Sequence, residues 1–271
     1  MNSLVNPKTK TPKNNMWQHR YLIIQLVSHE LKARYYTSFL GFLWILFVPL
    51  STLAIYTFVF SVVLPSTWRD SGSIPYAFIL FAALIPFNLF SEVVNRSPGL
   101  ILSYPNYVKK VVFPLHILPI VALGSAFADS LVSLALLLIG LMVSLHNLPL
   151  TVLLLPLAYL PILLITLGTA WFLAALGVYV RDVGPAINII TRLFFFLTPI
   201  VYPLERIPQK YLWVMKFNPL SSVVEAFRDI LVWGKPLNWA EWSIWFMAGI
   251  CITILGYTWF MKTRTGFADV L

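Results

Sequence analysis

Asp129 is the side chain in this sequence that is best placed to do chemistry, because it is the acidic residue near the middle of an apolar run at about 118–145. An ionisable group inside such a run is costly and indicates a proton relay or a water-lined path by default. The alternative is a structural carboxyl that another helix or nearby serines satisfy. Those serines are Ser125, Ser130 and Ser133. From the sequence alone, both interpretations stay open.

The sequence contains none of the common motifs of catalysis or nucleotide binding. The phosphate-binding pattern G-x-x-x-x-G-K-[ST] is missing, and the single Gly-Lys pair, Gly234-Lys235, is followed by Pro236. The four histidines lack the spacing of metal ligands, and no G-x-S-x-G nucleophile motif occurs. We therefore expect that this chain is not an enzyme and holds no ATP, metal or other cofactor of its own.

The composition is that of an integral membrane protein. Of the 271 residues, 59% are hydrophobic and only 11% are charged, and the mean hydropathy is +0.81. The net charge of +9 does not indicate nucleic-acid binding, because the basic residues lie beside apolar runs, where anionic lipid explains them. We expect an all-α fold with a disordered cytoplasmic head at 1–16 and one transmembrane domain at 17–271.

Six apolar runs predict six transmembrane helices, because about 20 residues of helix cross the ~30 Å hydrocarbon core. Most of the 19 Lys and Arg residues fall in segments that this arrangement puts on the inner side, so both termini are expected in the cytoplasm. Small residues around Asp129 also predict a helix face that another helix can approach closely. The expected spans lie at about 39–63, 76–94, 118–145, 151–178, 186–201 and 242–261.

A helical pattern precedes the first span. Apolar residues recur at intervals of three and four over 17–35, with Tyr21 and Ile24 among them, while Gln25 and Lys32 fall on the other face. This pattern predicts an amphipathic helix that lies in the membrane interface.

The segment between the fifth and sixth spans is too apolar for a simple loop. Asn218 followed by Pro219 predicts a helix start, and Gly234 predicts its end. A helix of about 15 residues is too short to cross the membrane. Together with residues 207–217, it predicts a pair of short helices that re-enter the membrane from the outer side.

The start of the first span carries a recognisable pattern. It reads Arg34-Tyr35, Ser38, Leu40-Gly41 and Leu43-Trp44, followed by Pro49-Leu50. This pattern resembles the signature R-Y-x-x-S-x-L-G-x-L-W of type-2 ABC-exporter permeases that move polysaccharides such as O-antigen and teichoic acids. Segments 198–203 and 218–220 resemble the periplasmic gate region of that family, and the tail at 266–271 is also similar.

The resemblance implies a permease subunit of the bacterial cytoplasmic (inner) membrane that exports a lipid-linked polysaccharide. Such a permease forms a homodimer and docks two copies of a cytoplasmic ABC ATPase, which bind the ATP and Mg. Two alternatives remain. One is a drug or lipid exporter of the same superfamily, and the other is an ion-coupled secondary transporter that uses Asp129, although no inverted pair of broken spans is visible.

The resemblance also implies which residues contact the ATPase. The inner loop at 103–114 is basic, aromatic and bounded by prolines, like the family's coupling segment, although an ordinary positive-inside loop has a similar composition. The family commonly has an Arg-Glu pair where this chain has Leu115-His116. The expected coupling residues are Tyr104, Tyr107, Lys109, Lys110 and Phe113 in this loop, with Glu30 and Arg34 from the interface helix.

Aromatic rings and the short outer helix supply the expected route and gate. Flat rings can stack against sugar faces without gripping them, which suits a long repetitive substrate. The expected substrate-path residues are Tyr56, Phe194, Phe195, Phe196 and Tyr202. The gate residues implied by the resemblance are Val224, Phe227 and Arg228.

Overall fold

The computed structural model describes residues 19–36, 41, 43–59, 75–105, 113–145 and 148–270. Within these residues the chain is helical and has no β-strand, so the all-α prediction is confirmed. The expected head at 1–16 and the expected coupling residues Tyr107, Lys109 and Lys110 lie outside the described residues. The α-helices are α1 (Arg20–Tyr36), α2 (Leu43–Phe58), α3 (Tyr76–Arg96), α5 (Leu118–Leu145), α6 (Leu155–Tyr179), α7 (Val183–Leu197), α8 (Leu212–Lys216), α9 (Pro219–Arg228), α10 (Trp239–Thr263) and α11 (Phe267–Val270).

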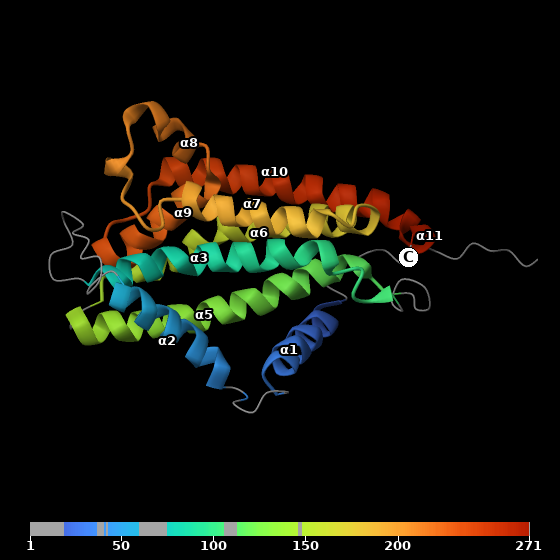
Figure 1. The fold of residues 1–271 in the computed structure, drawn as a ribbon, viewed down its shortest axis with the longest axis horizontal. Coiled ribbons are helices and arrows are strands. Elements are labelled where there is room, and N and C mark those ends of the chain that lie inside the picture. The colour runs from blue at the N-terminus through green and yellow to red at the C-terminus, as the bar shows by residue number, and fades with distance from the viewer. Residues whose placement is uncertain are drawn as a thin grey trace, which may run out of the picture.

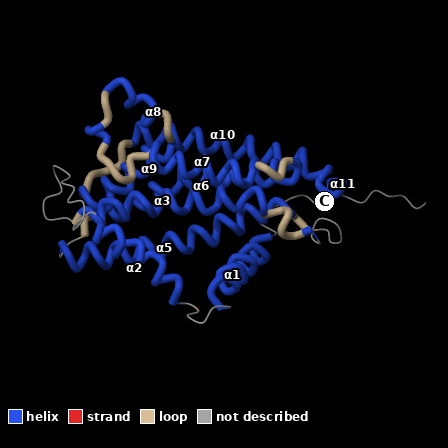
Figure 2. The backbone as a smooth tube through the Cα atoms, viewed as in Figure 1, coloured by secondary structure: helices blue, strands red, loops and turns tan. Residues whose placement is uncertain are grey.

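The longer helices form an elongated bundle. Helices α3, α5, α6, α7 and α10 run alongside one another, whereas α2 and α1 lie obliquely across one side (Figure 1). Helix α2 packs on α3 and α5, and α1 packs mainly on α5. The loops around α8 stand out at the end of the bundle that lies opposite α11 (Figure 2).

Among the described residues, four helical segments are long and apolar enough to cross a membrane, namely Tyr76–Gly99, Leu115–Ser144, Leu150–Tyr179 and Trp239–Val270. They correspond to four of the six expected spans. The other two expected spans contain shorter apolar helices in the described residues: α2 has 16 residues and α7 has 15. A straight helix of that length rises only ~24 Å or less, which is short of the ~30 Å hydrocarbon core.

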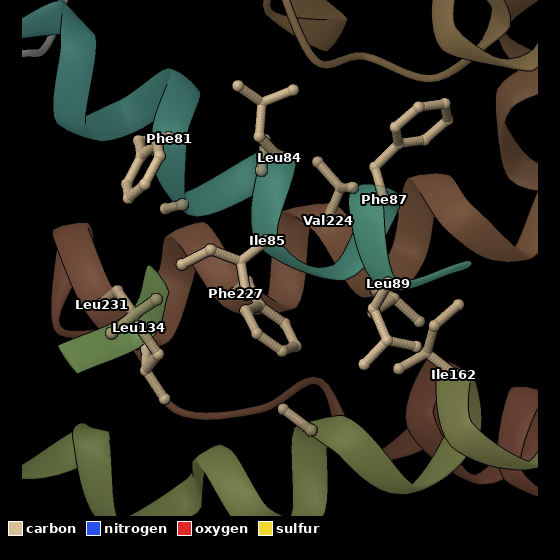
Figure 3. Close-up of a cluster of buried hydrophobic side chains, with 14 of the residues drawn as sticks. Phe81, Leu84, Ile85, Phe87, Leu89, Leu134, Ile162, Val224, Phe227 and Leu231 are labelled. Carbon is tan, nitrogen blue, oxygen red and sulfur yellow. The ribbon is translucent and has the colours of Figure 1, made fainter. Parts of the chain in front are cut away.

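Helix α3 is the centre of the bundle. Its apolar stretch is 72% buried, compared with 17% for that of α10. Figure 3 shows side chains of α3 facing Val224 and Phe227 of α9, Leu231 just after α9, Leu134 of α5 and Ile162 of α6. The segment 198–238 between α7 and α10, which we call the outer segment after the side on which it is expected, therefore shares one hydrophobic core with the long helices. The α3 side chains labelled there are Phe81, Leu84, Ile85, Phe87 and Leu89.

Helices α6 and α10 are held in backbone contact by glycines. A Cβ atom placed on Gly256 would lie 2.0 Å from the carbonyl oxygen of Gly168. Next to this crossing, the Thr253 hydroxyl donates a hydrogen bond to the Leu164 carbonyl at 2.8 Å. Small residues at such a crossing allow close helix association in membranes, where the hydrophobic effect does not drive it.

We expect Gly256→Ala to destabilise the protein by about 1–3 kcal/mol, because the new methyl group meets backbone that cannot move aside locally. The thermal unfolding midpoint in detergent should fall. The matched control is Gly99→Ala, since a Cβ atom there has nothing within 4 Å, and it should change stability by less than about 0.5 kcal/mol. Equal midpoints for the two variants would contradict the close α6–α10 crossing.

Candidate functional site

Arg34, near the C-terminal end of α1, is at the centre of an ionic cluster. Its guanidinium lies 2.8 Å from Asp129 of α5, 2.6 Å from Glu92 of α3 and 3.2 Å from Glu30 on its own helix. The Asp129 carboxyl is therefore ion-paired with another helix, which is one form of the structural alternative expected from the sequence. The cluster joins three helices that are far apart in the sequence.

Arg96, at the end of α3, completes the ionic cluster. It pairs with Glu30 of α1 and lies 3.5 Å from Glu92. The Ser125 hydroxyl donates a hydrogen bond to Glu30 at 2.9 Å. The five charged side chains of the cluster are between 16% and 34% exposed. Partial burial strengthens each attraction relative to a surface pair and makes any unpaired member costly.

A cavity of about 260 Å³ opens beside the ionic cluster. Helix α2 contributes Trp44 and Thr52 to its wall, α3 contributes Asn88, and α5 contributes Ser133. The cavity is therefore lined by an indole, hydroxyls and a carboxamide, with Arg34, Glu92 and Asp129 also at its surface. Within the described chain, the Asn88 carboxamide makes no hydrogen bond, so it is available to water or a ligand.

Helix α1 is exposed on one side and packed on the other. Tyr21 and Ile24 are exposed, and so are Gln25 and Lys32, so apolar and polar residues share the exposed side and the place of α1 in the membrane interface stays a prediction. The opposite side packs on α5, where a Cβ atom added to Gly124 would lie 2.9 Å from the Val27 side chain. The expected small-residue face of α5 thus receives α1.

The outer segment is anchored by Arg228, which is 0% exposed. Its guanidinium donates hydrogen bonds to the carbonyl oxygens of Pro199 and Ile200, to that of Ile79 in α3 at 3.3 Å, and to Glu225 at 2.7 Å. One side chain therefore ties α9 to the turn after α7 and to α3. A charge this deeply buried is tolerated because backbone carbonyls and a carboxylate surround it.

The start and end of the α9 segment follow the sequence prediction. The Asn218 side chain caps the helix by accepting a hydrogen bond from the Leu220 amide at 3.0 Å, and Pro219 is the first helical residue. After α9 the helix continues as a π-helical turn, Asp229–Trp233, and ends at Gly234 with a φ of 63°. Glycine adopts this left-handed conformation without a steric penalty.

Comparison with known proteins decides the family. A sequence profile described as ABC-2 type transporter matches residues 21–232, which is most of the chain. This protein belongs to the ABC-2 type transporter family.

Several curated relatives of this ABC-2 transporter subunit are export proteins. It is 29% identical over 252 residues to the O-antigen export system permease protein RfbA of Klebsiella pneumoniae, covering 92% of this chain and 95% of the relative. It is 33% identical to the RfbA permease of Myxococcus xanthus, covering 79% and 82% of the two chains. It is 27% identical to the polysialic acid transport protein KpsM of Escherichia coli, covering 77% and 80%.

The structure brings two of the expected coupling residues into the ionic cluster of this transporter, Glu30 and Arg34. Tyr104, eight positions after Arg96, is 42% exposed. Phe113, five residues before α5, is half-buried. These described ends of the loop adjoin α3 and α5, the same two helices that the cluster joins to α1. Their role in contacting an ATPase remains a prediction.

The side chains of the expected substrate-path residues differ in how far they are exposed. Phe196 is 68% exposed, whereas Phe194, Phe195 and Tyr56 pack against the core. The Phe195 ring meets that of Phe87 edge to face at 5.5 Å. The Tyr202 hydroxyl donates a hydrogen bond to the Phe196 carbonyl, and burial raises the pKa of Tyr202, so this donor stays protonated at neutral pH.

The expected gate residues are all internal in the single chain. Val224 and Phe227 are 0% exposed, and the Phe227 ring meets that of Tyr159 at 4.9 Å. Any contribution of these residues to a gate would therefore be made through packing and through the Arg228 anchor.

Sequence reasoning did not place Glu92 and Arg96 among the site residues. The available signal was the scarcity of charge, because only 11% of residues are charged and this pair lies at the end of an apolar segment. Such residues usually face the interior of a bundle or one another. Their partner Arg34 was identified from the family pattern, but nothing in that pattern indicates which helices meet there.

We expect Arg34→Gln to destabilise the protein by about 1–3 kcal/mol, between the values for exposed and for buried pairs, because Asp129 would lose its ion pair with Arg34 and Glu30 and Glu92 would be left with Arg96. The thermal unfolding midpoint should fall, and Asp129→Asn should cost less in the Arg34→Gln background than in the parent. Lys32→Gln, exposed on the same helix, is the control. Additive effects of Arg34→Gln and Asp129→Asn would show that the two side chains do not interact.

We expect Arg228→Met to destabilise the protein by about 3 kcal/mol or more, because it leaves Glu225 and several buried carbonyl groups without their donor. The segment 202–217 should become more sensitive to protease before global unfolding. Arg206→Met changes an exposed arginine of the same segment and should leave both properties near those of the parent. A protease pattern unaffected by Arg228→Met would rule out the anchoring role.

Proposed function

We propose that this chain is the membrane permease of an ABC exporter that carries a lipid-linked polysaccharide outward across the bacterial cytoplasmic membrane. The polysaccharide is of the O-antigen type, or of the capsular or teichoic acid type. The observation that carries the proposal is the match to an O-antigen export permease over 92% of this chain and 95% of the relative. The family match over residues 21–232 supports the transporter class independently.

The energy for export comes from a partner. The sequence has no phosphate-binding loop, so ATP and Mg bind to two copies of a cytoplasmic ABC ATPase that dock on a homodimer of this chain. In this arrangement α2 and α7 complete a set of six spans although each helix is shorter than the hydrocarbon core, because a bilayer can thin locally around a short hydrophobic helix. Both termini lie in the cytoplasm. The distribution of Lys and Arg in the sequence supports this orientation.

The ionic cluster suits a coupling role. The loop between α3 and α5 is the segment expected to touch the ATPase, and both of its flanking helices are ion-paired to α1 through Arg34. A displacement of the loop therefore acts on α1, α3 and α5 together. The cavity beside the cluster has a charged end at Arg34, Glu92 and Asp129 and mostly apolar walls, so it offers a sugar both hydrogen-bonding groups and an aromatic ring to stack on.

The outer segment suits a gating role. With six spans, α7 ends and α10 begins on the outer side, so the chain between them must return to the side that it left. We therefore infer that α8, and α9 with its π-helical turn, of 5, 10 and 5 residues, dip into the outer leaflet and return. Their hydrophobic contact with α3 provides the protein cover that such a dip requires. A polymer longer than the membrane is thick suits a continuous conduit with an outer gate better than an enclosed cavity.

The test is deletion of this permease in the organism that encodes it. Polysaccharide should disappear from the cell surface and accumulate on its lipid carrier inside, as measured by gel electrophoresis of surface and cytoplasmic fractions. Re-expression should restore export. The triple variant Lys109→Gln, Lys110→Gln, Phe113→Ala should reach the membrane normally but lose substrate-stimulated ATP hydrolysis with the ATPase, because the docking loop is altered. Lys235→Gln, in the outer segment, is the control.

Three results would overturn the proposal. The first is ATP hydrolysis by the purified permease alone. The second is unchanged surface polysaccharide after deletion. The third is loss of transport when the proton gradient is collapsed at constant ATP, which would support an ion-coupled carrier that uses Asp129 instead.

A further inference from the structure

A groove of about 400 Å³ lies between α6 and α10. Helix α10 lies along the edge of the bundle (Figure 1), and only 17% of its apolar stretch is buried. The groove belongs to neither the ionic cluster nor the outer segment. It lies between two helices that are long enough to cross a membrane.

Glycines create the groove. Gly168 and Gly256 bring the two backbones into contact and place no side chain at the crossing. Phe172 of α6 and Trp259 of α10 also line the groove, and their rings contact each other with centroids 5.6 Å apart. The floor of the groove is therefore formed by backbone at the glycines and by this pair of rings.

The polar groups along the groove are already satisfied. The Thr169 hydroxyl donates to the Ile165 carbonyl at 2.8 Å, and the Thr258 hydroxyl donates to the Leu255 carbonyl at 3.0 Å. Both bonds stay within a single helix. The groove therefore offers an apolar surface along its length and requires no polar occupant.

The length of the groove matches one leaflet of a bilayer. Along α10 it extends from Ile252 to Lys262, which is ~15 Å at the rise of an α-helix. Half of the ~30 Å hydrocarbon core is the same distance. An extended acyl chain that starts at Lys262 would therefore end near the middle of the membrane.

The Lys262 end of the groove fits a phosphate headgroup. Lys262 lies in the last turn of α10, is exposed, and makes no ion pair with any described residue. Trp259, one turn earlier, is 41% exposed, and tryptophan favours headgroup depth. A lysine near the membrane surface attracts anionic lipid.

We propose that this groove is a binding site for one anionic phospholipid of the bilayer, with an acyl chain between α6 and α10 and the phosphate at Lys262. The site goes beyond the proposed export function and depends on it only in the statement that Lys262 faces the cytoplasmic leaflet. Lipid retention is measured without export, so failure of this proposal and failure of the proposed function are distinguishable.

The test uses the permease purified with its ATPase partner and exchanged into micelles that contain phosphatidylglycerol, phosphatidylcholine or polyprenyl phosphate. Native mass spectrometry counts the lipids that stay bound. The parent should retain phosphatidylglycerol in preference to phosphatidylcholine. Lys262→Gln should weaken phosphatidylglycerol binding about fivefold and leave phosphatidylcholine unchanged, because only the headgroup contact is lost.

Two further variants separate the groove from general surface charge. Thr258→Trp fills the groove and should reduce retention of both phospholipids, with its fold checked by gel filtration. Lys32→Gln removes a basic charge from exposed α1 and should leave the tightly retained lipid unchanged. The proposal is overturned if the parent shows no preference for phosphatidylglycerol, if Lys262→Gln behaves like Lys32→Gln, or if polyprenyl phosphate binds in preference to both phospholipids.

Discussion

The Arg34 guanidinium is shared by carboxylates from three helices, and the attachment of α1 to α3 and α5 depends on it. Its partners come from α1, α3 and α5, so removal of α1 from the bundle would leave Glu92 and Asp129 without this cation in a low-dielectric setting. An interfacial helix would otherwise be held by modest lipid contacts and a few apolar side chains. The ion pairs join α1 to α3 and α5, the helices on either side of the loop that we propose as the coupling segment.

A second arginine, Arg228, joins helical segments near the other end of α3, through backbone carbonyl groups and the Glu225 carboxylate. Arg228 binds the Ile79 carbonyl of α3, while Glu92 of the same helix binds Arg34. These two positions are 13 residues apart, or ~20 Å along an α-helix. Between them α3 is almost wholly apolar and buried. The most buried helix of the bundle therefore carries a charged clamp near each end, and a continuous packed element joins the proposed coupling and gating regions.

Helix α10, at the edge of the bundle, is held by different interactions, because lipid is expected to replace protein as its neighbour. Helix α10 is mostly exposed and is attached to α6 by backbone contact at Gly168 and Gly256 and by the Thr253 hydrogen bond. In a membrane, burial of apolar side chains against protein brings little gain over burial against lipid, so close packing and hydrogen bonds decide such contacts. The groove beside the crossing is a by-product of the same glycines.

The sequence by itself determined the helical class, the positions of the four long apolar helices, the cap at Asn218 and the stop at Gly234, because these depend on local hydropathy and backbone preference. It also identified Asp129 as an unusual charge, and the family pattern identified Arg34. Only the tertiary structure decided that they pair with each other, that Glu92 and Arg96 join them, and that Val224 and Phe227 are buried in the core. Residues 34 and 129 are 95 positions apart, and no local pattern encodes which helices meet. Helix packing in three dimensions fixes those partners, through small-residue faces such as that of Gly124 against Val27.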